Sequence, residues 1–318
     1  MKIIQAYKKG FTLTASSMTM VLLLYVVTMV AALLVAIPFK IMLNNAIGNS
    51  MSLYSLLTDF DYTSYKDFLL HNISISNFLK SQILWFGVFY LLFSIFTTGG
   101  ILHIIQENQN KFSLAEFLKG CVTYLQSFFG LAILIVFLHF FIAVVIYGLA
   151  AMIIGERLSS VRSELEILLI VGISIIAHIF FALLLAIISD YSKIIIVKSD
   201  FRKIIPSFGK AVLFSLGKFF SVYSLYIFIA LTPILFGILY FIADMKIGMV
   251  SSNTIILMTF IQQLIIGIRI FTKVWILAGQ YSFYSGSIML NQEIPEIEIT
   301  EEAEEWNFDD LKEPNIES

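Results

Sequence analysis

Two histidines lie within long apolar stretches of this 318-residue chain, where ionisable side chains are rare. His139 stands about 20 residues before the Ser159-Ser160 dipeptide, and His178 stands about 18 residues after it. If that dipeptide forms the turn between two antiparallel helices, the two imidazoles lie at similar depth and could face each other. Such a pair could relay protons or contribute to a metal site. Alternatively, each histidine donates a hydrogen bond within the helix bundle and has a structural role.

The surroundings of the histidine pair argue against metal chemistry. A metal site normally uses three or four ligands, and the sequence places no Asp, Glu or Cys at the depth of His139 and His178. Hydrolase elbows, phosphate-binding loops and zinc-peptidase motifs are also missing from the chain. We therefore expect no metal, no cofactor and no enzymatic activity.

A second group of polar residues lies in the last apolar stretch. Arg269 and Lys273 are four residues apart, so they share one face of a helix, and Gln262 and Gln263 precede them by about two turns. Asp190, near the end of the fourth stretch, is expected at the same depth and is the natural counter-ion. Together these residues predict a basic pocket for an anionic head group or a hydrophobic client with a polar end. The alternative is that Arg269 only snorkels to the interface beside a structural ion pair.

The apolar stretches that carry these residues define the fold class. Each of the six reaches the roughly 20 residues that a helix needs to cross a bilayer. Backbone groups in lipid must be hydrogen-bonded within their own segment, so stretches of this kind form helices. Hydrophobic residues make up 59% of the chain and charged residues 13%. The sequence predicts an all-α polytopic membrane protein with six transmembrane helices, at about residues 18–38, 83–105, 127–154, 167–189, 219–243 and 254–277.

The chain divides into a membrane domain, residues 1–290, and an acidic tail, residues 291–318. The tail holds 11 acidic residues and one lysine, a net charge of −10, which predicts a disordered segment. Within it, Trp306, Phe308 and Leu311 stand among acidic residues, a pattern suited to docking on a basic protein partner. The tail could instead fold back on the basic face of its own membrane domain, or remain solvated without a function.

Lysine and arginine positions predict the topology. With the N-terminus inside, the cytoplasmic segments before the last span hold eleven Lys and Arg residues and the outer segments hold six, so both termini are expected in the cytoplasm. Scattered lysines of this kind give no support for nucleic-acid binding. The single cysteine, Cys121, cannot form an intrachain disulfide.

A weak repeat precedes the odd-numbered spans. Each copy has an aromatic residue, any residue, a lysine and a small residue, in Tyr7-Lys8-Lys9-Gly10, Phe117-Leu118-Lys119-Gly120 and Phe208-Gly209-Lys210-Ala211. Each copy lies in a short amphipathic approach, whose lysines would meet anionic lipid head groups at the cytoplasmic face. We therefore expect three helical hairpins, each led by an interfacial helix. Alternatively, the motifs reflect only the lysines and aromatic residues common at membrane interfaces.

Glycines and a proline mark special places within the spans. Thr97-Thr98-Gly99-Gly100 in the second span permits close helix approach or a local break, and Pro233 in the fifth span frees a backbone carbonyl. Packing and a simple kink are the favoured interpretations, since transporter sites normally place such breaks in corresponding halves.

Three short motifs resemble a widespread group of uncharacterised six-span bacterial membrane proteins. They are Gly99-Gly100 followed by Phe112–Phe117 and Gly120-Cys121, Asp59-Phe60-Asp61-Tyr62, and Asp190-Tyr191-Ser192-Lys193 followed by Ile194–Val197. The plan is also similar to the membrane domain attached to some glycerophosphodiester phosphodiesterases. The catalytic barrel of those proteins has no counterpart here, so the resemblance implies a membrane module of the bacterial inner membrane and no activity.

Three functions remain in view. The first is a non-enzymatic membrane module, a scaffold or assembly factor that organises lipid or a protein partner. The second is a transporter or channel for a small or amphiphilic substrate that uses a basic cytoplasmic-side cavity around Arg269, Lys273 and Asp190. A lipid-modifying enzyme using His139 and His178 is the least favoured, because acid–base catalysis usually places a carboxylate or metal beside the histidine.

Overall fold

The structure is a computed structural model that describes residues 2–47, 62–71, 73–107, 112–157, 164–199, 203–247 and 251–292. Helices account for 97% of this part of the chain, which contains no strand. Six of the helices are long and apolar enough to cross a membrane, so the protein is a multi-pass membrane protein and the predicted all-α fold is confirmed. The predicted partner motif at Trp306, Phe308 and Leu311 lies outside the described residues.

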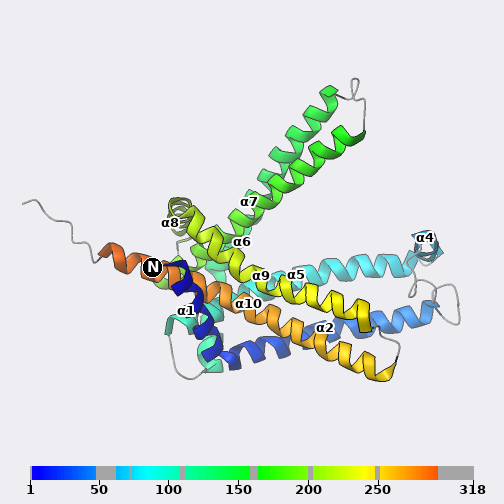
Figure 1. Cartoon of the computed structure of the whole chain (residues 1–318), viewed down its shortest axis with the longest axis horizontal. Helices are drawn as coiled ribbons and strands as arrows, with labels where there is room; N and C mark the ends of the chain where they lie inside the picture. The colour runs from blue at the N-terminus through cyan, green and yellow to red at the C-terminus, as the bar shows by residue number, and fades with distance from the viewer. Residues whose placement is uncertain are drawn as a thin grey trace, which may run out of the picture.

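The six long helices form three hairpins, α2 with α5, α6 with α7, and α9 with α10 (Figure 1). In chain order the helices are α1 (Ile3–Ser16), α2 (Met18–Ile47), α4 (Tyr62–His71), α5 (Ile73–Glu107), α6 (Leu114–Arg157), α7 (Glu164–Ser199), α8 (Ile204–Gly217), α9 (Phe219–Ile247) and α10 (Ser252–Gln292). We call α5, α7 and α10 the return helices, because each closes a hairpin.

The predicted leading segments adopt two forms. The first and third are separate helices, α1 and α8, which end at turns around Ser17 and Lys218. The second is not separate: residues 114–126 continue without interruption into the third span as the first part of α6. We refer to α1, the first part of α6, and α8 as the leading helices.

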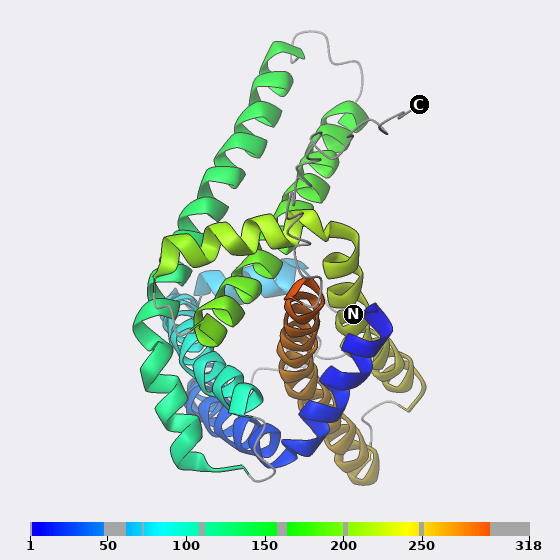
Figure 2. The same cartoon turned by 90° about the vertical axis from the view of Figure 1, so that its left-hand side faces the viewer.

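The leading helices pack in a cyclic order. Helix α1 packs on α10, the first part of α6 packs on α5, and α8 packs on α7, so each leading helix contacts the return helix of the preceding hairpin. The three return helices also contact one another, which places them at the centre of the arrangement. Figure 2 looks onto the end of the molecule where α1 and α8 lie. This order is the arrangement expected of three repeated units around an approximate axis.

Small residues allow the leading helices to approach the return helices closely. Helix α1 buries Ala6, Gly10 and Thr14, and α8 buries Ser207, Ala211 and Ser215 at the same spacing and the same places relative to the motif. A Cβ built on Gly10 would lie 2.6 Å from the backbone N and Cα atoms of Gly279 in α10. A Cβ on Gly99 would lie 2.9 Å from the carbonyl oxygen of Gly120. The glycines of the second span therefore serve close packing, as the sequence favours.

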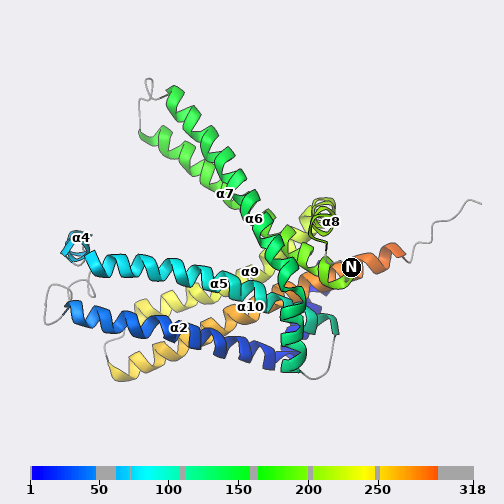
Figure 3. The same ribbon diagram turned by 180° about the vertical axis from the view of Figure 1, so that it is seen from behind.

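The buried core occupies one end of the molecule, where α1 and α8 lie, and we call this the packed end. It takes its side chains from the start of α2, α6 and α9 and from the last part of each return helix. Toward the other end the helices separate, and the α6–α7 hairpin diverges from the bundle of α2, α5, α9 and α10 (Figures 1 and 3). Large apolar side chains there, such as Phe140 and Ile176, are exposed as lipid-facing residues are.

Candidate functional site

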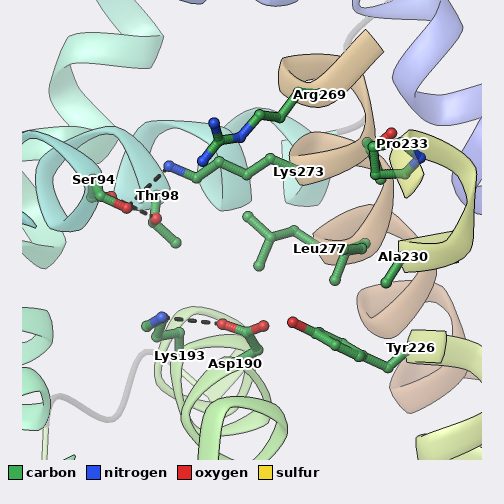
Figure 4. Close-up of a pocket in the computed structure, with 12 residues that line it drawn as sticks. Ser94, Thr98, Asp190, Lys193, Tyr226, Ala230, Pro233, Arg269, Lys273 and Leu277 are labelled. Atoms are coloured by element: carbon green, nitrogen blue, oxygen red, sulfur yellow. Dashed lines mark hydrogen bonds and ion pairs between the residues drawn. The ribbon is translucent and has the colours of Figure 1, made fainter. Parts of the chain in front are cut away.

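A charged cavity of about 290 Å³ lies where the three return helices and α9 meet, beside the packed end. We call it the central cavity. Its polar and charged lining comes from four helices: Ser94 and Thr98 of α5, Asp190 and Lys193 of α7, Tyr226 of α9, and Arg269, Thr272 and Lys273 of α10 (Figure 4). The structure thus brings Arg269, Lys273 and Asp190 to one site, as the sequence predicts.

Lys273 is held in the wall of the central cavity by a hydrogen bond to a neutral group. Its Nζ donates a hydrogen bond of 3.0 Å to the Ser94 hydroxyl oxygen, which links α10 to α5. The Thr98 hydroxyl in turn donates to the Ser94 backbone carbonyl at 2.6 Å, a bond within α5. A neutral hydroxyl does not compensate the charge of Lys273, so the ammonium keeps the capacity to bind an anion.

Asp190 pairs with a different cation from the one the sequence indicates. The Lys193 Nζ lies 3.1 Å from Asp190 Oδ1, one turn along α7, and both side chains are about one-fifth exposed. No ion pair joins Asp190 to Arg269 or Lys273 in the part of the chain that the structure describes. The expected Asp190–Arg269 pair was therefore wrong, because a lysine three residues away on the same helix reaches the carboxylate first.

Arg269 supplies a second cation, which has no polar partner among the residues that the structure describes. Its side chain is exposed and extends beside Lys273 toward Ser94 and Thr98 (Figure 4). Within the described ranges the guanidinium makes no hydrogen bond or ion pair. With Lys193 balanced by Asp190, the lining carries a net charge of +2 from Arg269 and Lys273.

The two glutamines lie outside the central cavity. Gln262 donates a hydrogen bond of 2.7 Å to the Tyr240 hydroxyl in α9, and Gln263 accepts one of 2.7 Å from the Tyr25 hydroxyl in α2. Neither side chain lines the cavity. They join α10 to the two outgoing helices beside it and have a structural role, so this part of the predicted cluster was wrong.

His139 and His178 face each other, as depth counting from the turn suggests. Their ring centroids are 4.9 Å apart and the rings are nearly perpendicular, at 89°. The Tyr147 ring lies 5.4 Å from the His178 ring. The Nδ1 atom of His178 is buried and has no hydrogen-bond partner among the described residues. The edge-to-face contact is the favourable geometry of aromatic packing between two helices.

The histidine pair has few groups around it that could extend it into a reaction centre. The described part of the chain contains no group of three or more His, Cys, Asp or Glu residues placed to hold a metal ion. Both rings are only partly buried. The arrangement matches the structural role considered for these residues better than a metal or proton site.

Several residues that line the central cavity could not be identified from the sequence of any one helix. Ser94, Thr98 and Tyr226 lie on helices whose sequences carry no charge at that depth. Lys193 enters the sequence predictions within the Asp190-Tyr191-Ser192-Lys193 motif and as one of the cytoplasmic positive charges, but not as a site residue. One signal was available: the Asp190-x-x-Lys193 spacing places both charges on the same face of α7.

Comparison of the chain with protein-family models, with curated proteins and with solved structures finds no match in any of the three.

Proposed function

We propose that this protein is a non-enzymatic membrane module that binds the anionic group of a small or amphiphilic ligand in the central cavity. The observation that carries the proposal is the unbalanced charge of the lining: among the described residues Arg269 has no polar partner and Lys273 is bonded only to a hydroxyl. Arginine and lysine side chains are suited to carboxylate and phosphate groups. A volume of about 290 Å³ suits a head group or small anion, not a whole lipid.

This assignment favours the transporter or channel interpretation over a pure scaffold. A binding site at the junction of three helix hairpins can be exposed or closed by movement of one hairpin relative to the others. Pro233 lies in the wall of the cavity on α9, where its missing N–H gives the helix a weak point. Movement of the α9–α10 hairpin is the step that would transfer a bound ligand.

A scaffold or assembly factor is the second candidate. It is favoured by the packed end, where tightly packed leading helices surround the return helices and form a fixed surface. The acidic tail with Trp306, Phe308 and Leu311 would then recruit a basic protein partner. The resemblance to uncharacterised six-span bacterial membrane proteins is compatible with either candidate.

We test the central cavity with a fluorescent amphiphile that has a carboxylate head group, dansylaminoundecanoic acid. In detergent-solubilised protein, Lys273→Met is expected to weaken binding by about tenfold, because the variant keeps the side-chain length and removes one charge. The matched control is Lys246→Met, which removes an exposed lysine at the far end of α9. Equal affinity for the uncharged methyl ester, or equal loss in both variants, would overturn the proposal.

We further propose that the protein resides in a bacterial inner membrane with both termini in the cytoplasm, which places the packed end at the cytoplasmic face. The single native cysteine, Cys121, is fully buried and so is protected from aqueous reagents. A membrane-impermeant maleimide added to intact spheroplasts is expected to label Ser251→Cys and to leave Lys9→Cys unlabelled until lysis. The reverse pattern would invert the topology.

A further inference from the structure

A second hollow, separate from the central cavity, lies between α1 and α9 at the packed end. It has a volume of about 770 Å³ and is lined mainly by apolar surface from Ile3 and Tyr7 of α1 and Phe228 of α9, with Ser221 of α9 in its wall. Lys2 and Lys8, both exposed, also line it. We call this hollow the α1–α9 groove. Its shape joins an apolar trough to a positively charged rim.

The internal repeat contains a second contact equivalent to the one between α1 and α9, and in that contact the corresponding space is filled. Ile204 of α8 stands seven residues before Ala211, as Ile3 of α1 stands seven residues before Gly10. Gly130 of α6 stands ten residues after Gly120, as Ser221 stands ten residues after Ala211. The α8–α6 contact is thus the counterpart of the α1–α9 contact.

The two counterparts differ in packing. In the α8–α6 contact, Ile204 lies directly against Gly130, so closely that a Cβ on the glycine would collide with the isoleucine Cδ1. In the α1–α9 contact, Ile3 and Ser221 stand on the wall of an open groove. Because the fold is able to close this position with its own side chains, the opening at α1–α9 is a local departure from the repeat that leaves room for a ligand.

The charges around the groove identify the class of ligand. Lys2 and Lys8 carry two positive charges at its rim without an acidic partner among the described residues. Lys218 lines an adjacent hollow that shares Ser221 with the groove. An apolar trough that opens along membrane-facing helices and ends at lysines complements an acyl chain joined to an anionic head group.

We propose that the α1–α9 groove binds one anionic phospholipid of the leaflet at the packed end, with an acyl chain along Ile3, Tyr7 and Phe228 and the phosphate between Lys2 and Lys8. The bound lipid lies between Ile3 and Ser221, whose counterparts Ile204 and Gly130 contact each other directly. This site is independent of the proposed ligand of the central cavity, because the two hollows share no lining residue.

Native mass spectrometry tests this assignment on protein reconstituted in phosphatidylethanolamine and phosphatidylglycerol vesicles and then released into detergent. Wild-type protein is expected to retain one phosphatidylglycerol. In the double variant Lys2→Glu/Lys8→Glu the ratio of lipid-bound to lipid-free protein is expected to fall about tenfold. The matched control, Lys9→Glu/Lys210→Glu, reverses two exposed lysines of the leading helices that do not line the groove. Equal losses in both double variants would show that the lipid responds only to surface charge and would overturn the proposal.

A second variant tests the apolar part of the groove without changing its charges. Ser221→Leu fills the space between Ser221 and Ile3 with a larger side chain, so it is expected to reduce phosphatidylglycerol retention as strongly as the double charge reversal. Lys273→Met is expected to retain the lipid, which separates this result from failure of the central cavity. Full retention in Ser221→Leu, or equal retention of phosphatidylethanolamine by wild-type protein, would exclude the groove as the binding site.

Discussion

Replacing Gly10 by alanine is expected to destabilise the protein by about 2 kcal/mol, the cost of overpacking a close helix contact. The new Cβ would lie 2.6 Å from the Gly279 backbone, which cannot move aside as a flexible side chain can. Helix α1 would have to shift away from α10 and would weaken the hydrogen bond of 3.0 Å that the Trp275 indole donates to the Tyr7 carbonyl. Unfolding by dodecyl sulfate, followed by circular dichroism, measures the change.

Gly209 provides the control for this variant. It lies in the corresponding motif of α8, and a Cβ built there has no atom within 4 Å. Alanine at Gly209 is therefore expected to stabilise the protein by up to about 1 kcal/mol, the helix propensity difference. Both substitutions replace glycine by alanine, but their effects on the free energy of unfolding should have opposite signs. A stabilising effect at both positions would contradict the close α1–α10 contact.

Neutralising Asp190 is expected to lower the free energy of unfolding by about 2 kcal/mol. This is less than the roughly 3–5 kcal/mol lost when a fully buried ion pair is broken, because the side chains of Asp190 and Lys193 are about one-fifth exposed. Asp190→Asn leaves three cations around the central cavity without a nearby anion. Lys193→Gln should be less harmful, since it removes one of those cations. Thermal unfolding in detergent gives both values.

A double-mutant cycle then identifies the partner of Asp190. Asp190→Asn and Lys193→Gln should show a coupling energy of about 1 kcal/mol, whereas Asp190→Asn and Arg269→Gln should be additive within about 0.5 kcal/mol. Adding an anionic ligand should restore part of the stability lost in Asp190→Asn, because the anion replaces the missing charge. Strong coupling of Asp190 to Arg269 would restore the pairing expected from the sequence and contradict the Lys193 assignment.

Properties set by single segments could be predicted from the sequence. The six spans follow from the length of apolar stretches, and the meeting of His139 with His178 follows from counting residues outward from one turn. The presence of Arg269 and Asp190 at one level follows from their depth. Each inference uses only the rise of a helix and the thickness of a bilayer.

Properties that depend on which helix faces which could not be predicted in the same way. Depth places Asp190 near Arg269 but gives neither the rotation of α7 nor the side-chain conformers, and the Asp190 carboxylate pairs with Lys193 on its own helix. The Ser94 partner of Lys273 lies 179 residues away in the chain, and a serine in a span carries no mark of its role. The continuity of α6 through its leading segment was also missed, since a lysine and a glycine at the motif do not break a helix.

The concentration of the core at the packed end has a mechanical consequence. The core joins the return helices over their last part, and beyond it the α6–α7 hairpin separates from the bundle of α2, α5, α9 and α10. A bilayer that becomes thinner or thicker changes the tilt that each hairpin needs to keep its apolar length covered. The α6–α7 hairpin is able to make this adjustment separately from the bundle, pivoting about the packed end, so membrane thickness acts first on the angle between the two and thereby on the width of the central cavity.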